Sequence, residues 1–198
     1  LNSIFVSISS LTISLILSLS SLSIYRELME RNFLSHKIIF ISISILLFVP
    51  SLSLSAMIFY LNFTLGFLLN NFLIVTLINS FFITPIIFIF LINKFMENSK
   101  SEYRNSYLFN IHPFIRLIYI DMPKIRNELL LISSAVFILS LGDLTSVTIF
   151  NDSSFKTIPL YISQLYSSYR YDDAFFILSI FIIFIIILMF IPLRYMFS

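Results

Sequence analysis

The sequence predicts an all-α membrane protein, a bundle of about five transmembrane helices that forms a single domain over residues 1–198. Hydrophobic residues make up 59% of the chain and charged residues only 11%, against roughly 25% in soluble domains. The mean hydropathy is +1.00. Charged residues are clustered, and long stretches without any charge separate the clusters. This composition excludes both a soluble globule and a disordered chain.

The uncharged stretches set the expected spans. A helix rises about 1.5 Å per residue, so about 20 apolar residues cross a hydrocarbon core of about 30 Å. The stretch 38–93 is too long for one crossing and suits two, joined by a loop at about 61–70, where Asn62, Gly66 and Asn70 interrupt the apolar run. We expect spans at about 3–24, 38–60, 71–93, 129–150 and 174–194.

Two of these spans contain a proline. Pro50 lies inside the second span and Pro85 inside the third. Each should kink its helix or mark a packed break, because proline removes a backbone donor from the helix.

The Lys and Arg residues predict the orientation. With five spans, loops 25–37 and 94–128 share one side with the C-terminal tail, and this side holds ten of the twelve Lys and Arg residues. The other side holds only Lys156 and Arg170. By the positive-inside rule the first side is cytoplasmic, which leaves the N-terminus outside.

The composition also limits the chemistry. The chain has no Cys, two His and a net charge of +2. Thiolate metal sites and Cys nucleophiles are therefore excluded, and little remains for a metal site, a cofactor site or a nucleic-acid surface. We expect no catalytic residue, no metal and no cofactor.

The longest polar stretch is the cytoplasmic loop at about 95–128. It suits two short helices separated by a turn at 110–113, the second beginning at Pro113. The second helix carries Phe114, Leu117 and Ile118 on one side and Arg116 on another, so it is amphipathic. Such a helix lies on the membrane surface or in a groove of a partner protein, or it is a connector that packs on its own spans.

Asp143 is the one charged residue between Leu129 and Asn151, inside the fourth span. A carboxylate in the bilayer centre costs about 2.5–3.5 kcal/mol on insertion scales. It should therefore face the bundle or an aqueous cavity. Two roles are open: a substrate-pathway carboxylate, or a structural cap bonded to Thr145 or to a neighbouring helix.

The outer segment 151–173 predicts one short helix. Thr157 can cap its first turn, Pro159 tolerates an early helical position, and the helix should run to about Tyr169. Arg170 either contacts a partner protein or pairs with the adjacent acidic residues Asp172 and Asp173.

The residues of the cytoplasmic loop and the outer segment resemble those of permeases of binding-protein-dependent ABC importers. The cytoplasmic signature of these permeases reads Glu-Ala-Ala, three residues, Gly, nine residues, Ile, two residues, Pro. Here Ile120 and Pro123 match its end, Asn110 stands at the Gly position, and the Glu-Ala-Ala positions hold Arg104, Asn105 and Ser106.

Residues 140–174 closely resemble the C-terminal region of thiamine ABC transporter permeases. That region has a Ser-Leu-Gly-Asp helix end, then Phe-x-Thr-Leu-Pro-x-Tyr-x-x-Gln, then Ser-Tyr-Arg-x-x-Asp-Ala. The counterparts here are Ser140, Gly142, Asp143, Phe155, Thr157, Pro159, Tyr161, Gln164, Ser168, Tyr169, Arg170, Asp173 and Ala174.

The resemblance implies a type I (MetI-like) importer permease of the bacterial inner membrane, most like the second half of such a protein. It further implies an ABC ATPase docked on the signature loop, a periplasmic substrate-binding protein, a second permease half, surrounding membrane lipid and no catalytic activity of the chain itself. Gly142 and Asp143 become candidates for the substrate pathway, and Tyr169, Arg170, Asp172 and Asp173 candidates for contact with the binding protein.

Other classes remain open beside a thiamine permease. Ferric-iron permeases share the architecture. A small structural or respiratory membrane subunit is a further alternative, and a proton-relaying subunit would be expected to carry intramembrane Lys, Glu or His.

Overall fold

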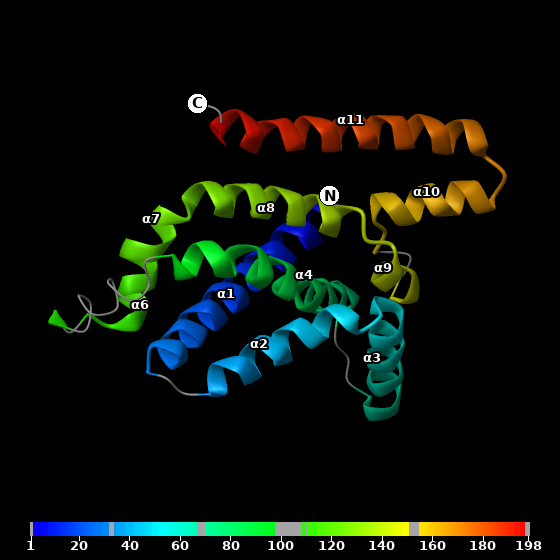
Figure 1. Cartoon of the computed structure of the whole chain (residues 1–198). Coiled ribbons are helices and arrows are strands. Elements are labelled where there is room, and N and C mark those ends of the chain that lie inside the picture. The colour runs from blue at the N-terminus through cyan, green and yellow to red at the C-terminus, as the bar shows by residue number, and fades with distance from the viewer. Residues whose placement is uncertain are drawn as a thin grey trace.

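The computed structural model describes residues 2–31, 34–66, 70–97, 108–109, 111–150 and 155–196. Figure 1 shows that helices form nearly all of this part of the chain, which confirms the all-α prediction. The helices α1 (Asn2–Glu30) and α4 (Asn71–Met96) lie in the middle of the bundle. The helices α8 (Arg126–Leu141) and α11 (Tyr171–Met196) run along one side of them.

Four helical segments of the described chain are long and apolar enough to cross a membrane, and a bent pair brings the number to five if it counts as one span. The four segments are Asn2–Glu30, Asn71–Met96, Arg126–Ile149 and Tyr171–Phe190. They fall on the stretches expected at 3–24, 71–93, 129–150 and 174–194. The chain is a multi-pass helical membrane protein.

The stretch expected as one span at 38–60 is not one straight helix. The helix α2 (Ser35–Ile45) and a 3-10 turn, η1 (Leu46–Phe48), are followed by α3 (Ser51–Leu65), and the two parts are bent by 91°. Val49 between them is extended, with ψ 117°. Pro50 explains this, since a proline disfavours the helical conformation in the residue before it and has no N–H to continue the ladder.

The helix α3 continues to Leu65, past the beginning of the loop expected at about 61–70. Gly66 ends it in the left-handed conformation at φ 62°, which a residue without Cβ adopts readily. Asn70 then caps α4, and its side chain accepts a hydrogen bond from the Phe72 N–H at 3.1 Å. Pro85 is buried within α4, which the structure assigns as one helix.

The centre of the bundle is the contact between α1 and α4, where small residues let the two backbones approach. α1 contributes a buried stripe of serines three or four residues apart, namely Ser3, Ser7, Ser10, Ser14 and Ser18. Most of their hydroxyls are bonded to carbonyls of the preceding turn, for example Ser7 Oγ to the Ser3 carbonyl at 2.7 Å.

The segment between α4 and α8 contains α6 (Pro113–Arg116), a π-helical turn, η2 (Leu117–Asp121), and α7 (Met122–Lys124). Pro113 begins this run, as expected, and the His112 ring accepts a hydrogen bond from the Phe114 N–H at 3.3 Å. The expected first helix of the loop lies largely outside the described residues.

The structure buries the arginine of this segment and exposes most of its apolar face. Arg116 is 1% exposed and lies on the buried side with Leu117, while Phe114 is 62% and Ile118 40% exposed. The exposed Phe114 and Ile118 belong to the apolar face that the sequence predicts for a membrane surface or a partner groove. Arg116 lies near the charged groups of Arg26 and Asp121 instead.

The segment before α11 forms α10 (Ile158–Ser167), which packs against the beginning of α11. The expected helix is confirmed, but the expected cap is not. Thr157 stands at the N-cap without a side-chain cap bond. Instead, Ser3 Oγ of α1 accepts the hydrogen bond from the Ile158 N–H, at 2.8 Å.

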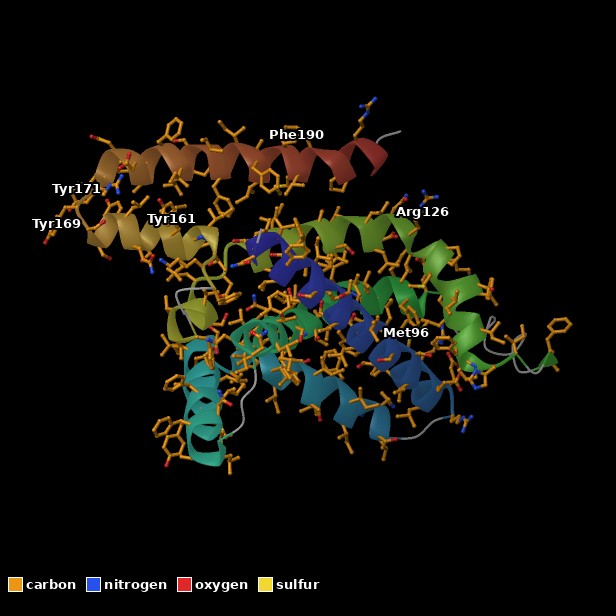
Figure 2. All side chains as sticks on the ribbon, turned by 180° about the vertical axis from the view of Figure 1, so that it is seen from behind. Met96, Arg126, Tyr161, Tyr169, Tyr171 and Phe190 are labelled. Carbon is orange, nitrogen blue, oxygen red and sulfur yellow. The ribbon has the colours of Figure 1, made fainter. Side chains whose placement is uncertain are left out.

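The two ends of the bundle differ in chemistry. Figure 2 places Tyr161, Tyr169 and Tyr171 at one end, which we call the tyrosine end, and Arg126 at the other. We call the second the arginine end, since Arg26 and Arg116 are also there. Tyrosine rings and basic side chains are the residue types that membrane proteins place at the two membrane surfaces.

Candidate functional site

Asp143 lies in the break between α8 and α9 (Thr145–Ile149), toward the tyrosine end. Its Oδ1 accepts hydrogen bonds from the Thr145 N–H at 3.1 Å and from Thr145 Oγ1 at 2.8 Å. Ser146 Oγ donates to Oδ2. Both hydroxyl donors belong to the first turn of α9, so the carboxylate caps this short helix, as one of the two expected roles requires.

The same carboxylate belongs to a larger cluster of polar side chains from several helices. Ser146 Oγ approaches Asn79 Oδ1 of α4 at 3.2 Å, and Asn79 Nδ2 donates to Ser140 Oγ of α8 at 3.4 Å. Ser140 Oγ lies 2.8 Å from Ser10 Oγ of α1. We call these five residues, Ser10, Asn79, Ser140, Asp143 and Ser146, the polar cluster.

A small cleft of about 200 Å³ opens beside the polar cluster. Asp143, Asn79 and Ser140 line it together with Ser51 of α3 and several apolar side chains. Ser51 Oγ lies 3.0 Å from Thr145 Oγ1, which links α3 to the same group. Within the described residues no Lys or Arg pairs with Asp143, so the cleft has an anionic side chain without a basic partner.

Gly142, the other candidate for the substrate pathway, is exposed and ends α8. Its φ of −82° is open to any residue. A Cβ placed there would meet the Ile138 and Leu139 carbonyl oxygens at 3.6 and 3.8 Å, which is ordinary contact. The geometry gives Gly142 no role that depends on the absence of a side chain.

α1 connects the polar cluster to the arginine end. Ser10 takes part in the cluster, and Arg26 of the same helix lies about 24 Å further along. Arg26 Nη1 lies 2.6 Å from Asp121 Oδ1 in η2, and the two side chains are 0% and 4% exposed. The Arg26 guanidinium also lies over the Phe95 ring of α4, 4.5 Å from its centroid.

A second buried arginine accompanies this pair. Burial lowers the pKa of Arg116, and the charge of Arg26 lowers it further, while the charge of Asp121 acts in the opposite direction. Asp121 therefore stabilises two neighbouring cations, and the π-helical turn η2 is held to α1 by charge as well as by packing.

The expected ATPase-coupling residues are placed only in part. Ile120 lies in η2, partly buried, and Pro123 is exposed in α7. Arg104, Asn105, Ser106 and Asn110 lie outside the described residues.

The candidates for contact with a binding protein lie where α10 turns into α11. Tyr169 is exposed, with a left-handed φ of 61°. Arg170 pairs with Asp173: Nη2 and Nε lie 2.6 and 2.8 Å from Oδ2. This is the internal pairing that the sequence left open as an alternative to contact with a partner. Asp172 is exposed beside them.

Sequence reasoning missed several members of these two sites. Asn79 and Ser10 of the polar cluster, and the Arg26–Asp121 pair, were not singled out. A signal existed for two of them: Asn79 is a polar residue inside a predicted span, and Ser10 belongs to a serine repeat with helical spacing. No local signal pairs Arg26 with Asp121, since the two are far apart in the chain.

No group of three His, Asp or Glu side chains that could hold a metal ion occurs in the described part of the chain. No protein-family model matches this sequence, and no curated protein matches it either. The fold and the buried polar cluster define a multi-pass helical membrane protein with an ionisable group inside its bundle.

Proposed function

We propose that this protein is a permease subunit of a bacterial ABC importer, with thiamine or its phosphates as the substrate. The substrate would pass through the inner membrane, powered by a separate ATPase that docks on the cytoplasmic loop. The tyrosine end would face outward and the arginine end the cytoplasm, with the C-terminus inside. The resemblance of residues 140–174 to thiamine permeases supports the choice of substrate.

The observation that carries the proposal is the role of α1 as a link between two sites. An importer must couple a cytoplasmic ATPase to a binding site inside the membrane. α1 contacts the polar cluster through Ser10 and the cytoplasmic segment through Arg26. A helix held at both ends by polar contacts can move both sites together, and a coupling of this kind requires a physical connection between them.

Asp143 is the residue that would recognise the substrate. The thiazolium ring of thiamine is a cation, and a carboxylate that lines a cleft without a basic partner complements it. Three hydrogen bonds fix the orientation of the Asp143 carboxylate, so binding would require little ordering of this side chain.

Alternating access would follow from two states of the cytoplasmic segment. Nucleotide binding closes the ATPase dimer, and segment 104–123 transmits this motion to the spans. Nucleotide and substrate shift such an equilibrium only through their different affinities for the two states.

The first test is capture of the ATPase. The intact chain is purified from its native membranes beside a variant in which residues 104–123 are replaced by a Gly/Ser linker. We expect an ATPase subunit with the intact chain and none with the variant. If neither sample contains an ATPase although both proteins are stably inserted, the importer proposal is wrong.

The second test addresses the substrate. Membrane vesicles with the captured complex are assayed for uptake of labelled thiamine, with Asp143→Asn as the variant and Asp143→Glu, which keeps the charge, as the control. Asp143→Asn keeps the size of the side chain and removes its charge, so we expect thiamine uptake to fall about tenfold or more, as for a lost charge contact. If the vesicles take up ferric iron and not thiamine, the protein is still an importer permease, but the proposed substrate is wrong.

A further inference from the structure

An apolar groove with a single basic side chain lies at the arginine end, away from the polar cluster. It consists of two clefts of about 510 and 420 Å³, within the size range of ligand pockets. The first lies between α8 and α11 and the second between α8 and α1. Arg126, Leu130 and Ser133 line both, so the two clefts meet along the beginning of α8.

The groove runs from the membrane surface into the bilayer. Arg126, Leu130, Ser133 and Phe137 follow one another at helical spacing along one face of α8, over about 16 Å. Apart from Arg126 the lining is almost entirely apolar, with Leu188 of α11 on one side and Leu15 of α1 on the other. A ligand of this groove must be apolar along most of its length.

Arg126 supplies the charge at the surface. Its side chain is exposed, and no acidic group of the described residues forms an ion pair with it. The nearby carboxylate of Glu128 approaches Lys94 instead, at 3.9 Å. Figure 2 places Arg126 where α8 begins, at the opposite end of the bundle from Tyr169 and Tyr171. An anion at this position would find a cation that no carboxylate of the described chain neutralises.

We propose that this groove is a specific site for an anionic phospholipid. The phosphate headgroup pairs with Arg126, and one acyl chain enters each of the two clefts that meet there. A two-chain lipid with one negative headgroup matches both the charge and the branched shape of the groove. Basic pockets between transmembrane helices recognise anionic headgroups in this way. The proposal requires only that the chain is a membrane protein, and it does not depend on what the protein transports.

The test is native mass spectrometry of the full chain in detergent, with phosphatidylglycerol or phosphatidylcholine of identical acyl chains. We expect the wild-type protein to retain phosphatidylglycerol more tightly than phosphatidylcholine. Arg126→Gln should weaken the binding of phosphatidylglycerol about fivefold. This is the effect expected of one basic side chain at an anionic membrane surface. Lys37→Gln is the matched control, an exposed cation of the same end outside the groove, and should leave retention unchanged.

A second pair of variants tests the clefts themselves. Ser133→Phe fills the junction and keeps Arg126, so it should abolish phosphatidylglycerol retention. Ser179→Phe adds the same bulk on the exposed face of α11 and should have no effect. Far-UV circular dichroism shows that each variant is folded.

Four results would overturn the proposal. Arg126→Gln and Lys37→Gln could retain phosphatidylglycerol equally, or the wild-type protein could retain both lipids equally. Glycerol 3-phosphate could displace the lipid, which would indicate a site for a free phosphate compound. Finally, the protein could be a dimer that Ser133→Phe dissociates, which would show that a second copy covers the groove.

Discussion

Arg26 and Asp121 form an ion pair that is shielded from solvent on both sides, with Nη1 and Oδ1 2.6 Å apart. The ion pairs Arg31–Glu27 and Arg170–Asp173 are at least partly exposed by comparison. A buried pair of this kind adds little net stability relative to apolar residues, but loss of one partner leaves a buried charge without compensation. The ion pair holds the π-helical turn η2 against α1.

Asp121→Asn should therefore be strongly destabilising. We expect a decrease of about 3–5 kcal/mol in the free energy of unfolding, because Arg26 would then be a buried cation without the carboxylate with which it pairs. Arg26→Met should lower the free energy of unfolding by less, because the Asp121 carboxylate would still have Arg116 as a neighbouring cation. Unfolding in sodium dodecyl sulfate, followed by circular dichroism, measures both. A loss for Asp121→Asn no larger than that for the exposed Asp172→Asn would refute the role of the pair.

Asn79→Leu should loosen the polar cluster. Asn79 bonds to Ser140 of α8 and Ser146 of α9, and interhelical hydrogen bonds in membranes are worth about 0.6 kcal/mol each on average. We expect a loss of about 1 kcal/mol in the same unfolding assay. Ser134→Ala is the control, because that hydroxyl bonds only to the Leu131 carbonyl of its own helix. Equal stability of the two variants would mean that the cluster does not hold the helices together.

The two glycines should respond differently to alanine. Gly142→Ala places its Cβ in ordinary contact distance at a common φ, so stability should stay within about 0.5 kcal/mol of wild type. Gly66→Ala forces a residue with Cβ into the left-handed region and should cost about 1–2 kcal/mol. Denaturant midpoints of the two variants test this order. A larger loss at Gly142 would point to a close approach there that the structure lacks.

Arg170→Gln should leave the fold intact. Its ion pair with Asp173 has side chains 63% and 53% exposed, and pairs in solvent contribute about 0–1 kcal/mol. We expect a shift of the thermal midpoint within the scatter of replicate scans. If the variant also loses capture of the proposed binding protein, the residue acts at the surface, and a clear drop in stability would instead assign it a structural role.

The sequence predicted the fold well wherever length and hydropathy decide it. The regions of α1, α4, α8 and α11 follow from apolar stretches with little or no charge, and Pro50 was expected to disturb its span. The direction of the turn at Pro50 depends on what α3 packs against, which no local pattern contains. Because the backbone at Val49 is extended and not helical, it allows a wide range of angles between α2 and α3.

The sites were predicted less completely, because their residues come from distant parts of the chain. Asp143 stood out as a charge inside a span, and its direct partners Thr145 and Ser146 are close to it in sequence. Asn79 and Ser10 of the polar cluster belong to other helices. The amphipathic pattern of 113–120 separated Arg116 from Phe114, yet it could not show which side is buried. That choice depends on Asp121 and Arg26, and the pattern within one helix contains no information about a partner on another.

The turn at Pro50 also affects the membrane around the protein. Because α3 bends by 91° away from α2, a crossing at this place would be made by the helix before the bend alone. Residues 35–48 extend about 22 Å along their axis, against a hydrocarbon thickness of about 30 Å. The bilayer would become thinner beside a crossing helix this short. The bilayer would thus be thinnest beside α2, and the chain would favour membranes with short acyl chains.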